Sequence, residues 1–283
     1  EIVKELISKK AYVDSQFLGG YTPLYVASQN GHDGCVEELI KAKININKKA
    51  PNGSTPLYIA CQNGCTQIVS LLLQHGANPN ECSCGYSPLY IAIHKGWYEI
   101  VELLVDHPNI DINYSTDSIP PSLYIACEKN DLNIAKLLVQ KGANINMVIN
   151  GRNLLHDAIQ NNFDDSIIIW LLETFPNMRY KTNSENKTPF ELCTPKNYHI
   201  VIKFLMELTL REAEQNTHIS HPSIQTHEDI ESQNVHVLQV SGQSIDQSID
   251  RSIDQSLDVE SNSHTSHYVS QIPIDMNFPL EVI

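Results

Sequence analysis

The stretch GYTPLYVASQNG, residues 20–31, carries a helix start, a short apolar helix and a helix stop. Thr22 is a favoured N-cap residue, and Pro23 suits the first helical position because its missing amide hydrogen would be unbonded there in any case. Gly31 can end the helix in a left-handed conformation. Glycine-flanked loops can also cradle phosphates. The stretch alone therefore permits either a catalytic loop or a purely structural role.

Copies of this stretch along the chain favour the structural role. Close copies are GSTPLYIACQNG (53–64) and GYSPLYIAIHKG (85–96), and looser ones are PSLYIACEKN (121–130), GRNLLHDAIQNN (151–162) and KTPFELCTPKN (187–197). A second marker returns every 33 residues, at Asp14, Asn47, Asn80, Asn113 and Asn146. A pattern that stays in register over five or six units predicts that the glycines and the Thr-Pro pairs form turns and helix caps.

A second amphipathic helix follows the first in each unit. In one unit its apolar residues are Ile68, Val69, Leu72 and Leu73, at helical spacing. A single pair of such helices cannot bury its apolar face, whereas stacked pairs bury one another's faces. The predicted fold is therefore all-α, a solenoid of stacked helix-turn-helix units joined by hairpin loops.

These units resemble the ankyrin repeat, whose signature is Gly-x-Thr-Pro-Leu-His-x-Ala. The resemblance covers residues 1–208 and implies an ankyrin-repeat solenoid. In the family, the signature histidine ties the helix start to nearby backbone; here only His156 keeps it. We expect the tyrosines that replace it to pack between repeats: Tyr25, Tyr58, Tyr90 and Tyr124.

The repeat pattern predicts the domain boundaries. We divide residues 1–208 into a partial repeat (1–19), five repeats (20–52, 53–84, 85–118, 119–150 and 151–186) and a closing unit (187–208). The partial repeat matches only a second helix, so we expect the chain to begin inside a longer protein. Residues 209–283 are predicted to be a disordered low-complexity tail.

The tail carries most of the acidity. The net charge of the 283-residue chain is −14, and residues from Leu210 onward contribute −10 of it. This balance argues against binding to nucleic acid or to an anionic membrane surface. Residues 243–258, QSIDQSIDRSIDQSLD, repeat every four residues. They are either a disordered expansion or a short helix that folds onto a partner.

The cysteines and the catalytic motifs give no sign of an enzyme. Seven cysteines without a secretory segment or a membrane-spanning run indicate reduced thiols in an intracellular protein, cytoplasmic or alternatively nuclear. Cys61 and Cys127 occupy a small-residue position of the repeat, so packing explains them better than zinc does. No metalloprotease motif, nucleophile elbow or phosphate loop is present. We expect no catalytic residue, no metal site and no cofactor.

Ankyrin arrays bind protein partners through the concave helix face and the hairpin tips, so the resemblance implies a non-catalytic, monomeric scaffold for a protein partner, without nucleic-acid binding or membrane insertion. The implied contact positions lie just before Thr-Pro and just after the helical Ala. Trp97 joins them as an aromatic anchor. The candidate residues are Tyr21, Gln29, Asn30, Ser54, Gln62, Asn63, Tyr86, His94, Lys95, Trp97, Glu128, Lys129, Arg152, Gln160 and Asn161.

Two other functions remain open. One is a substrate receptor of a ubiquitin ligase, although the C-terminal QIPIDMNFPLEVI is a poor match to a SOCS box. The other is the regulatory array of a larger protein. The resemblance further implies that an asparaginyl hydroxylase modifies the asparagine that recurs in each unit; the alternative is a turn asparagine that bonds to backbone. These asparagines are Asn47, Asn80, Asn113 and Asn146.

Overall fold

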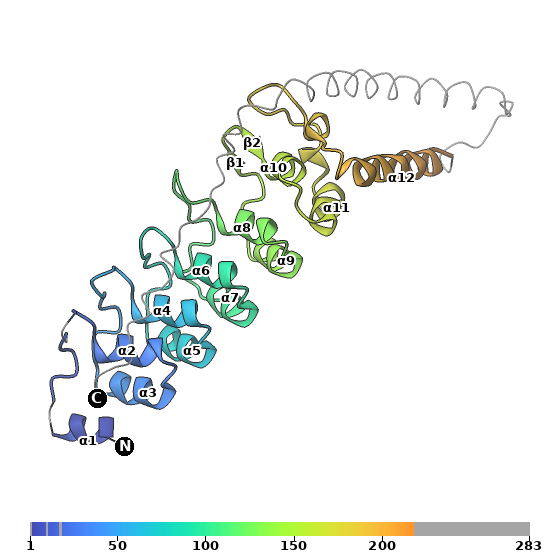
Figure 1. Ribbon diagram of the computed structural model, residues 1–283. Coiled ribbons are helices and arrows are strands. Elements are labelled where there is room, and N and C mark those ends of the chain that lie inside the picture. Colours follow the sequence, from blue (N-terminus) through green and yellow to red (C-terminus); the bar gives the residue numbers. More distant parts are fainter. Residues whose placement is uncertain (1, 10, 17–18, 218–283) are drawn as a thin grey trace, which may run out of the picture. The chain divides into compact units, whose positions relative to one another are not determined.

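The computed structural model describes residues 2–9, 11–16 and 19–217 (Figure 1). The chain divides into two compact units, Glu1–Asn216 and Thr217–Ile283, and the description below concerns the first. The tail repeat at 243–258 lies outside the described residues, so its two interpretations stay predictions.

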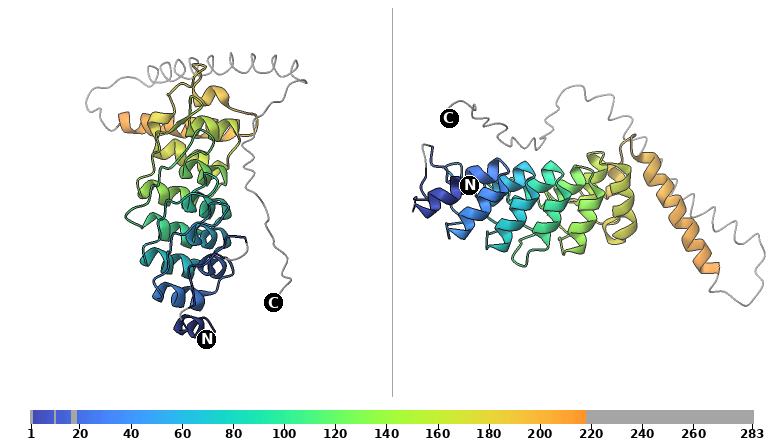
Figure 2. Two further views of the ribbon diagram at one scale, coloured as in Figure 1. Left: turned by 90° about the vertical axis from the view of Figure 1, so that its left-hand side faces the viewer. Right: turned by 90° about the horizontal axis from the view of Figure 1, so that it is seen from below.

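The first unit is a stack of helix pairs in two layers (Figures 1 and 2). The inner helices are α2 (Pro23–Gln29), α4 (Pro56–Asn63), α6 (Pro88–Lys95), α8 (Ser122–Glu128) and α10 (Leu154–Gln160). The outer helices are α3 (Asp33–Lys41), α5 (Thr66–Gln74), α7 (Tyr98–Val105), α9 (Leu132–Gln140) and α11 (Asp165–Thr174), with α1 (Ile2–Ser8) packed on α3.

Each inner helix contacts the next inner helix, and the outer helices contact one another in the same order from α3 through α5 and α7 to α9. The core lies between the two layers. Its recurring residue is the signature leucine, at most 1% exposed in Leu24, Leu57, Leu89, Leu123 and Leu155. Outer-helix residues such as Ile68 and Leu72 are equally buried. The predicted solenoid of helix-turn-helix units is thereby confirmed.

The inner helices begin as the caps predict. The hydroxyls of Thr22, Thr55 and Ser87 accept hydrogen bonds of 3.0–3.1 Å from the backbone N–H three residues later. A proline at the first helical position follows each of them. Gly64 ends α4 with φ 74°, a left-handed conformation that glycine adopts without steric cost.

The loops between helix pairs form hairpins. The one with regular strands pairs β1 (Val148–Ile149) with β2 (Arg152–Asn153) in antiparallel fashion. Single bridges close two others, between Ser83 and Tyr86 and between Thr116 and Ile119. The fold is therefore helical with very little strand.

The C-terminal end departs from the regular repeat. A 3-10 helix, η1 (Pro176–Met178), follows α11 in the fifth repeat. The inner helix of the closing unit is reduced to another 3-10 helix, η2 (Pro189–Leu192), which packs on α10. The last helix, α12 (Tyr198–Thr217), continues past residue 208. No helix of the described ranges is both long and apolar enough to cross a membrane.

Candidate functional site

The inner helices present four rows of equivalent residues, one from each repeat, and we call the surface that carries them the inner face. The first row precedes the N-cap: Tyr21, Ser54, Tyr86, Pro120 and Arg152. The tyrosine row follows one helical turn later: Tyr25, Tyr58, Tyr90, Tyr124 and His156. The polar row is Gln29, Gln62, His94, Glu128 and Gln160, and the end row is Asn30, Asn63, Lys95, Lys129 and Asn161.

The tyrosine row is the floor of the inner face. Tyr25, Tyr58 and Tyr90 are at most 5% exposed, and burial raises the pKa of Tyr25 and of Tyr58. The ring of Tyr21 lies 5.0 Å from that of Tyr25, and the ring of Tyr86 lies 4.8 Å from that of Tyr90. The phenols of Tyr25 and Tyr58 therefore stay neutral.

The fifth member of the tyrosine row keeps the signature histidine and its tether. The Nδ1 atom of His156 accepts a hydrogen bond from the Asn153 amide at 3.3 Å, while its Nε2 atom is 3.0 Å from the Lys187 carbonyl. The ring therefore joins the start of α10 to the closing unit. Burial, the larger effect, lowers its pKa.

The structure exposes most of the candidate partner-binding residues. The exposed ones are Asn30, Asn63, Lys95, Trp97, Glu128, Lys129, Gln160 and Asn161. The half-buried ones are Tyr21, Gln29, Gln62, Tyr86, His94 and Arg152. Fourteen of the fifteen candidates are therefore accessible, at least in part, to a partner.

The exception is Ser54, which is 3% exposed. Its hydroxyl lies 2.8 Å from the hydroxyl of Ser83 in the next hairpin. A small side chain at this position lets the neighbouring hairpin close over it, whereas tyrosine at the equivalent positions 21 and 86 stays half-buried. Ser54 is thus an inter-repeat contact and not part of the accessible inner face.

Two other candidates also connect repeats. Asn63 donates a hydrogen bond from Nδ2 to the Gln29 carbonyl at 2.7 Å. The Trp97 indole N–H donates to the Gln62 carbonyl at 3.5 Å, and the ring lies against Gly64. Trp97 remains 41% exposed. Both side chains therefore stabilise the stack, and only part of the indole is offered to a partner.

His94 is a neutral donor or acceptor in the polar row. Its ring stacks on Tyr90 at 6.2 Å, and its Nδ1 atom is buried without a hydrogen-bond partner. Burial, followed by the nearby charges of Lys129 and Lys95, lowers its pKa. Because protonation would bury an unpaired N–H, His94 is uncharged at neutral pH.

A charged cluster between α8 and α10 includes a residue that the sequence analysis missed. Asp157 is 3% exposed, and its Oδ1 atom lies 3.2 Å from Nε of Arg152. Burial raises the pKa of Asp157 to about 6, against the smaller opposing effect of Arg152. Arg152 also donates to Gln160 through Nη1. Tyr124 lies beside Asp157, and burial, the larger effect, raises its pKa.

A signal for Asp157 was present in the sequence. In the other four repeats the position between the tyrosine row and the helical alanine holds an aliphatic residue: Val26, Ile59, Ile91 and Ile125. An aspartate at a position that is aliphatic in every other repeat indicates a role other than core packing.

The recurring asparagines form a ladder along the side of the stack. Asn80 donates from Nδ2 to the Asn109 carbonyl at 2.6 Å and accepts at Oδ1 from the Asp111 amide at 2.9 Å. Asn47 and Asn113 make the same two bonds to the repeat that follows each of them. Asn146 is exposed and has no such pair of bonds within the described residues. Three of the four asparagines are therefore inter-repeat braces.

The cysteines lie apart from these features. Cys61 and Cys127 are fully buried in the small-residue position, and burial raises the pKa of Cys127 to about 12. Within the described part of the chain, all seven cysteines are free. No group of three potential metal ligands occurs among those residues.

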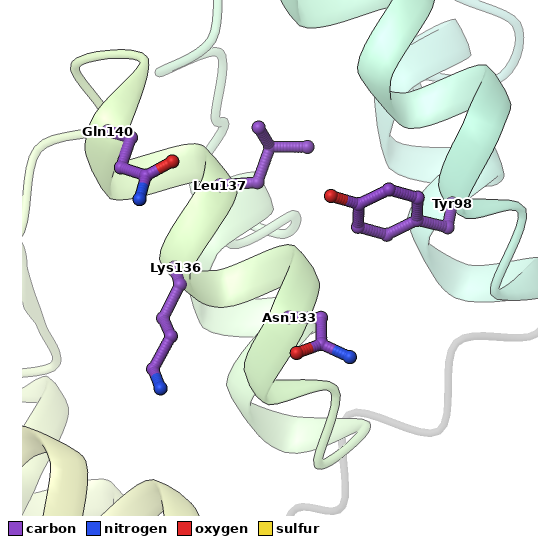
Figure 3. Close-up of a pocket in the computed structure, with 5 residues that line it drawn as sticks. All are labelled: Tyr98, Asn133, Lys136, Leu137 and Gln140. Carbon is purple, nitrogen blue, oxygen red and sulfur yellow. The ribbon is translucent and has the colours of Figure 1, made fainter.

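A separate concavity lies on the outer helices, between α7 and α9 (Figure 3). It has a volume of about 350 Å³ and is lined by Tyr98, Asn133, Lys136, Leu137 and Gln140. It is open to solvent, and its lining residues come from the outer helices, whereas the inner-face rows are on or beside the inner ones. Its lining is mixed, polar and apolar, without a cluster of like charges.

Comparison with known proteins identifies similar sequences and folds. The family model described as "Ankyrin repeats (3 copies)" matches residues 1–50, 42–116 and 123–218. The crystal structure of the human ASB11 ankyrin repeat domain is 26% identical, with a TM-score of 0.57, covering 68% of this chain and 86% of that one. The ankyrin repeat domain of Bcl-3, described as a unique member of the IkappaB protein family, is 23% identical, with a TM-score of 0.57, covering 69% and 87%. No curated protein matches the sequence.

Proposed function

Because the chain belongs to the ankyrin repeat family, whose model matches most of its length, we propose that it is a non-catalytic scaffold that binds a protein partner through the inner face. Ankyrin repeats are in general protein–protein interaction modules. The chemistry of the surface therefore has to supply the specificity, since the fold alone does not name a partner.

The continuity of the polar row and the end row carries this proposal. Hydrogen bonds join neighbouring repeats here: Asn63 of the end row donates to the Gln29 carbonyl, and Trp97, which lies beside these rows, donates to the Gln62 carbonyl. Five inner helices thus contribute to one long surface of amides and charges above the tyrosine row. An extended or helical segment of a partner can contact several repeats at once on such a surface.

The composition of the rows also supports binding. The half nearer the N-terminus, at α2 and α4, is uncharged and rich in amide side chains, which both donate and accept hydrogen bonds. The half formed by α6, α8 and α10 carries the charges. Half-buried aromatic rings, Tyr21 and Tyr86, border the rows, and tyrosine is enriched in binding hot spots.

Paired variants of the full chain test the assignment. Gln62→Ala with Lys95→Ala alters the inner face, whereas Gln67→Ala with Lys136→Ala makes the same chemical changes on exposed outer-helix positions. Proteins captured from cells by the wild type should be lost from the first variant and kept by the second. Equal capture by both variants, with unchanged thermal unfolding, would remove the inner face as the binding surface.

Hydroxylation of the ladder asparagines is a second proposal, and their hydrogen bonding predicts which of them is modified most readily. Asn47, Asn80 and Asn113 use both amide atoms as braces, whereas Asn146 is exposed without them. Asn146 is therefore the preferred substrate of an asparaginyl hydroxylase. Mass spectrometry after incubation with such an enzyme should show a gain of one oxygen at Asn146 first; modification of Asn80 first would contradict this order. The ubiquitin-ligase and regulatory-array alternatives stay predictions.

A further inference from the structure

Asp157 occupies a position that the rest of the array fills with aliphatic side chains. In the stack the equivalent residues Ile59, Ile91 and Ile125 are 1–6% exposed, while Val26, on the first inner helix that the structure describes, is 41% exposed. The position therefore faces the preceding inner helix, which for Asp157 is α8. Placing a carboxylate there costs desolvation that an aliphatic residue would avoid.

Arg152 and Gln160 compensate for this burial. Nε of Arg152 lies 3.2 Å from Oδ1 of Asp157, and Nη1 donates to Oε1 of Gln160. Asp157 and Gln160 both lie on α10, about one and two turns beyond Arg152. The guanidinium is therefore held along α10, whereas the first-row residues Tyr21 and Tyr86 each lie against the tyrosine four residues later.

The held guanidinium still faces outward. The Arg152 side chain is 30% exposed, and its Nη2 atom has no partner among the described residues. An arginine held at Nε and Nη1 with Nη2 free is pre-organised for a carboxylate, because charge-assisted donors are already in place and little side-chain freedom is left to lose.

The neighbouring charges favour an acidic ligand. Lys129 and Lys95, in the end row, are exposed and form no ion pair within the described ranges, and both act on His94. Glu128 is the opposing charge on the exposed end of α8. With Asp157 buried, the accessible charged residues of the inner-face rows are three cations (Lys95, Lys129 and Arg152) and one anion (Glu128), although the chain as a whole is strongly acidic.

We propose that Arg152, positioned by Asp157 and Gln160, is the anchor for an aspartate or glutamate side chain on an extended acidic segment of the protein partner. The inference rests on the proposed inner-face function and assigns its partner class. Asp157 acts through Arg152 and is a positioning residue. The buried pair serves recognition, since the four other repeats pack the same position without it.

Selection from a phage-displayed library of random twelve-residue peptides on the immobilised full chain tests this proposal. The enriched peptides should carry Asp or Glu, and changing that residue to Asn or Gln should weaken binding about tenfold. Arg152→Gln should weaken binding of the parent peptide by a similar factor. Arg152→Lys, which keeps the charge but loses the planar guanidinium, should weaken it by an intermediate factor. Lys136→Gln, the same loss of charge on α9, should leave the affinity unchanged.

A stability measurement separates positioning from a structural role. Arg152→Tyr with Asp157→Ile copies the pattern of Tyr86 and Ile91, and this variant should unfold at the same temperature as the wild type or higher, yet lose the acidic preference. A clear fall in its unfolding temperature would show that the pair is part of the fold and overturn the proposal. So would enriched peptides without acidic residues, or binding that Arg152→Gln leaves unchanged. Recovery of no binding peptide would count against the inner-face function as well.

Discussion

The indole of Trp97 lies across Gly64 of the preceding repeat, so that a β-carbon added to Gly64 would stand 2.8 Å from the ring. Gly64 ends α4 with φ 74°, and Gly96 ends α6 with φ 73°, yet nothing lies within 4 Å of a β-carbon built at Gly96. Two glycines with one backbone conformation therefore differ in a single contact, which comes from the next repeat.

We predict that Gly64→Ala destabilises the protein more than Gly96→Ala. Both changes carry the left-handed penalty of about 1–2 kcal/mol. Gly64→Ala adds the overlap with Trp97, of about 1–3 kcal/mol. Denaturant unfolding of the two variants checks the difference. In a Trp97→Ala background, Gly64→Ala should destabilise the protein no more than Gly96→Ala does. If Gly64→Ala remains more destabilising there, the extra loss of stability has a cause other than Trp97.

Removing one brace of the asparagine ladder should weaken the array. Asn80→Ala leaves the Asn109 carbonyl and the Asp111 amide without their bonds of 2.6 and 2.9 Å. The expected loss in unfolding free energy is about 1–3 kcal/mol. Asn146→Ala, at the exposed end of the ladder, is the matched control and should stay within about 0.5 kcal/mol of the wild type. Equal effects of the two changes would show that the ladder does not couple the repeats.

The buried carboxyl of Asp157 should make stability depend on pH with a definite sign. Its pKa is raised to about 6 in the fold, whereas an unfolded aspartate titrates near 3.9. The folded state therefore binds the proton more tightly, so the associated stability is fully present below about pH 4 and is lost as the pH rises through about 6. The loss over the whole titration is about 3 kcal/mol, of which about 2 kcal/mol falls between pH 4 and pH 7.

Comparison with Asp157→Asn isolates this titration from the other acids of the chain. The difference in unfolding free energy between wild type and variant should shift by about 2 kcal/mol in favour of the variant between pH 4 and pH 7. The Asn side chain has the same size and cannot titrate. A difference that stays constant over this range would mean that the Asp157 pKa is not raised.

Thiol reactivity should follow burial. Cys84 is exposed at a hairpin and should react with a thiol reagent in the native protein, whereas Cys61 and Cys127 should react only on unfolding. Burial raises the pKa of Cys127 to about 12, which removes the thiolate at neutral pH. Peptide mapping by mass spectrometry identifies the labelled sites, and Cys84→Ser should abolish the fastest labelling. Rapid native labelling of Cys127 would contradict its burial.

The features that depend on a few neighbouring residues were predictable. Thr22-Pro23 and its copies start the inner helices, Gly64 and Gly96 end α4 and α6, and the leucine column is buried, because caps, backbone conformation and amphipathic spacing act within one helix. Tyr25, Tyr58 and Tyr90 are buried as well, while Tyr124 is half-buried.

The candidate surface was predictable only as a set of equivalent positions. Tyr21, Ser54 and Tyr86 are equivalent in sequence, yet Ser54 alone is buried, because the hairpin that follows it closes over a small side chain. Asp157 was visible as an odd residue in an aliphatic column. Its partner could not be read from the repeat pattern, since the first-row residue that meets it is arginine in one unit only.

The sequence by itself therefore determined the repeat, its helix caps and its core, all of which follow from short-range spacing. Only the tertiary structure decided that Trp97 covers Gly64, that Asn80 braces the next repeat and that Asp157 holds Arg152 outward. The contact of Trp97 with Gly64 and the hydrogen bonds of Asn80 join residues about one repeat apart. The contact between Asp157 and Arg152 depends on which side chains of α10 remain accessible once α8 packs against it. All three contacts depend on the translation and rotation that relate one repeat to the next. This geometry exists only once the repeats stack.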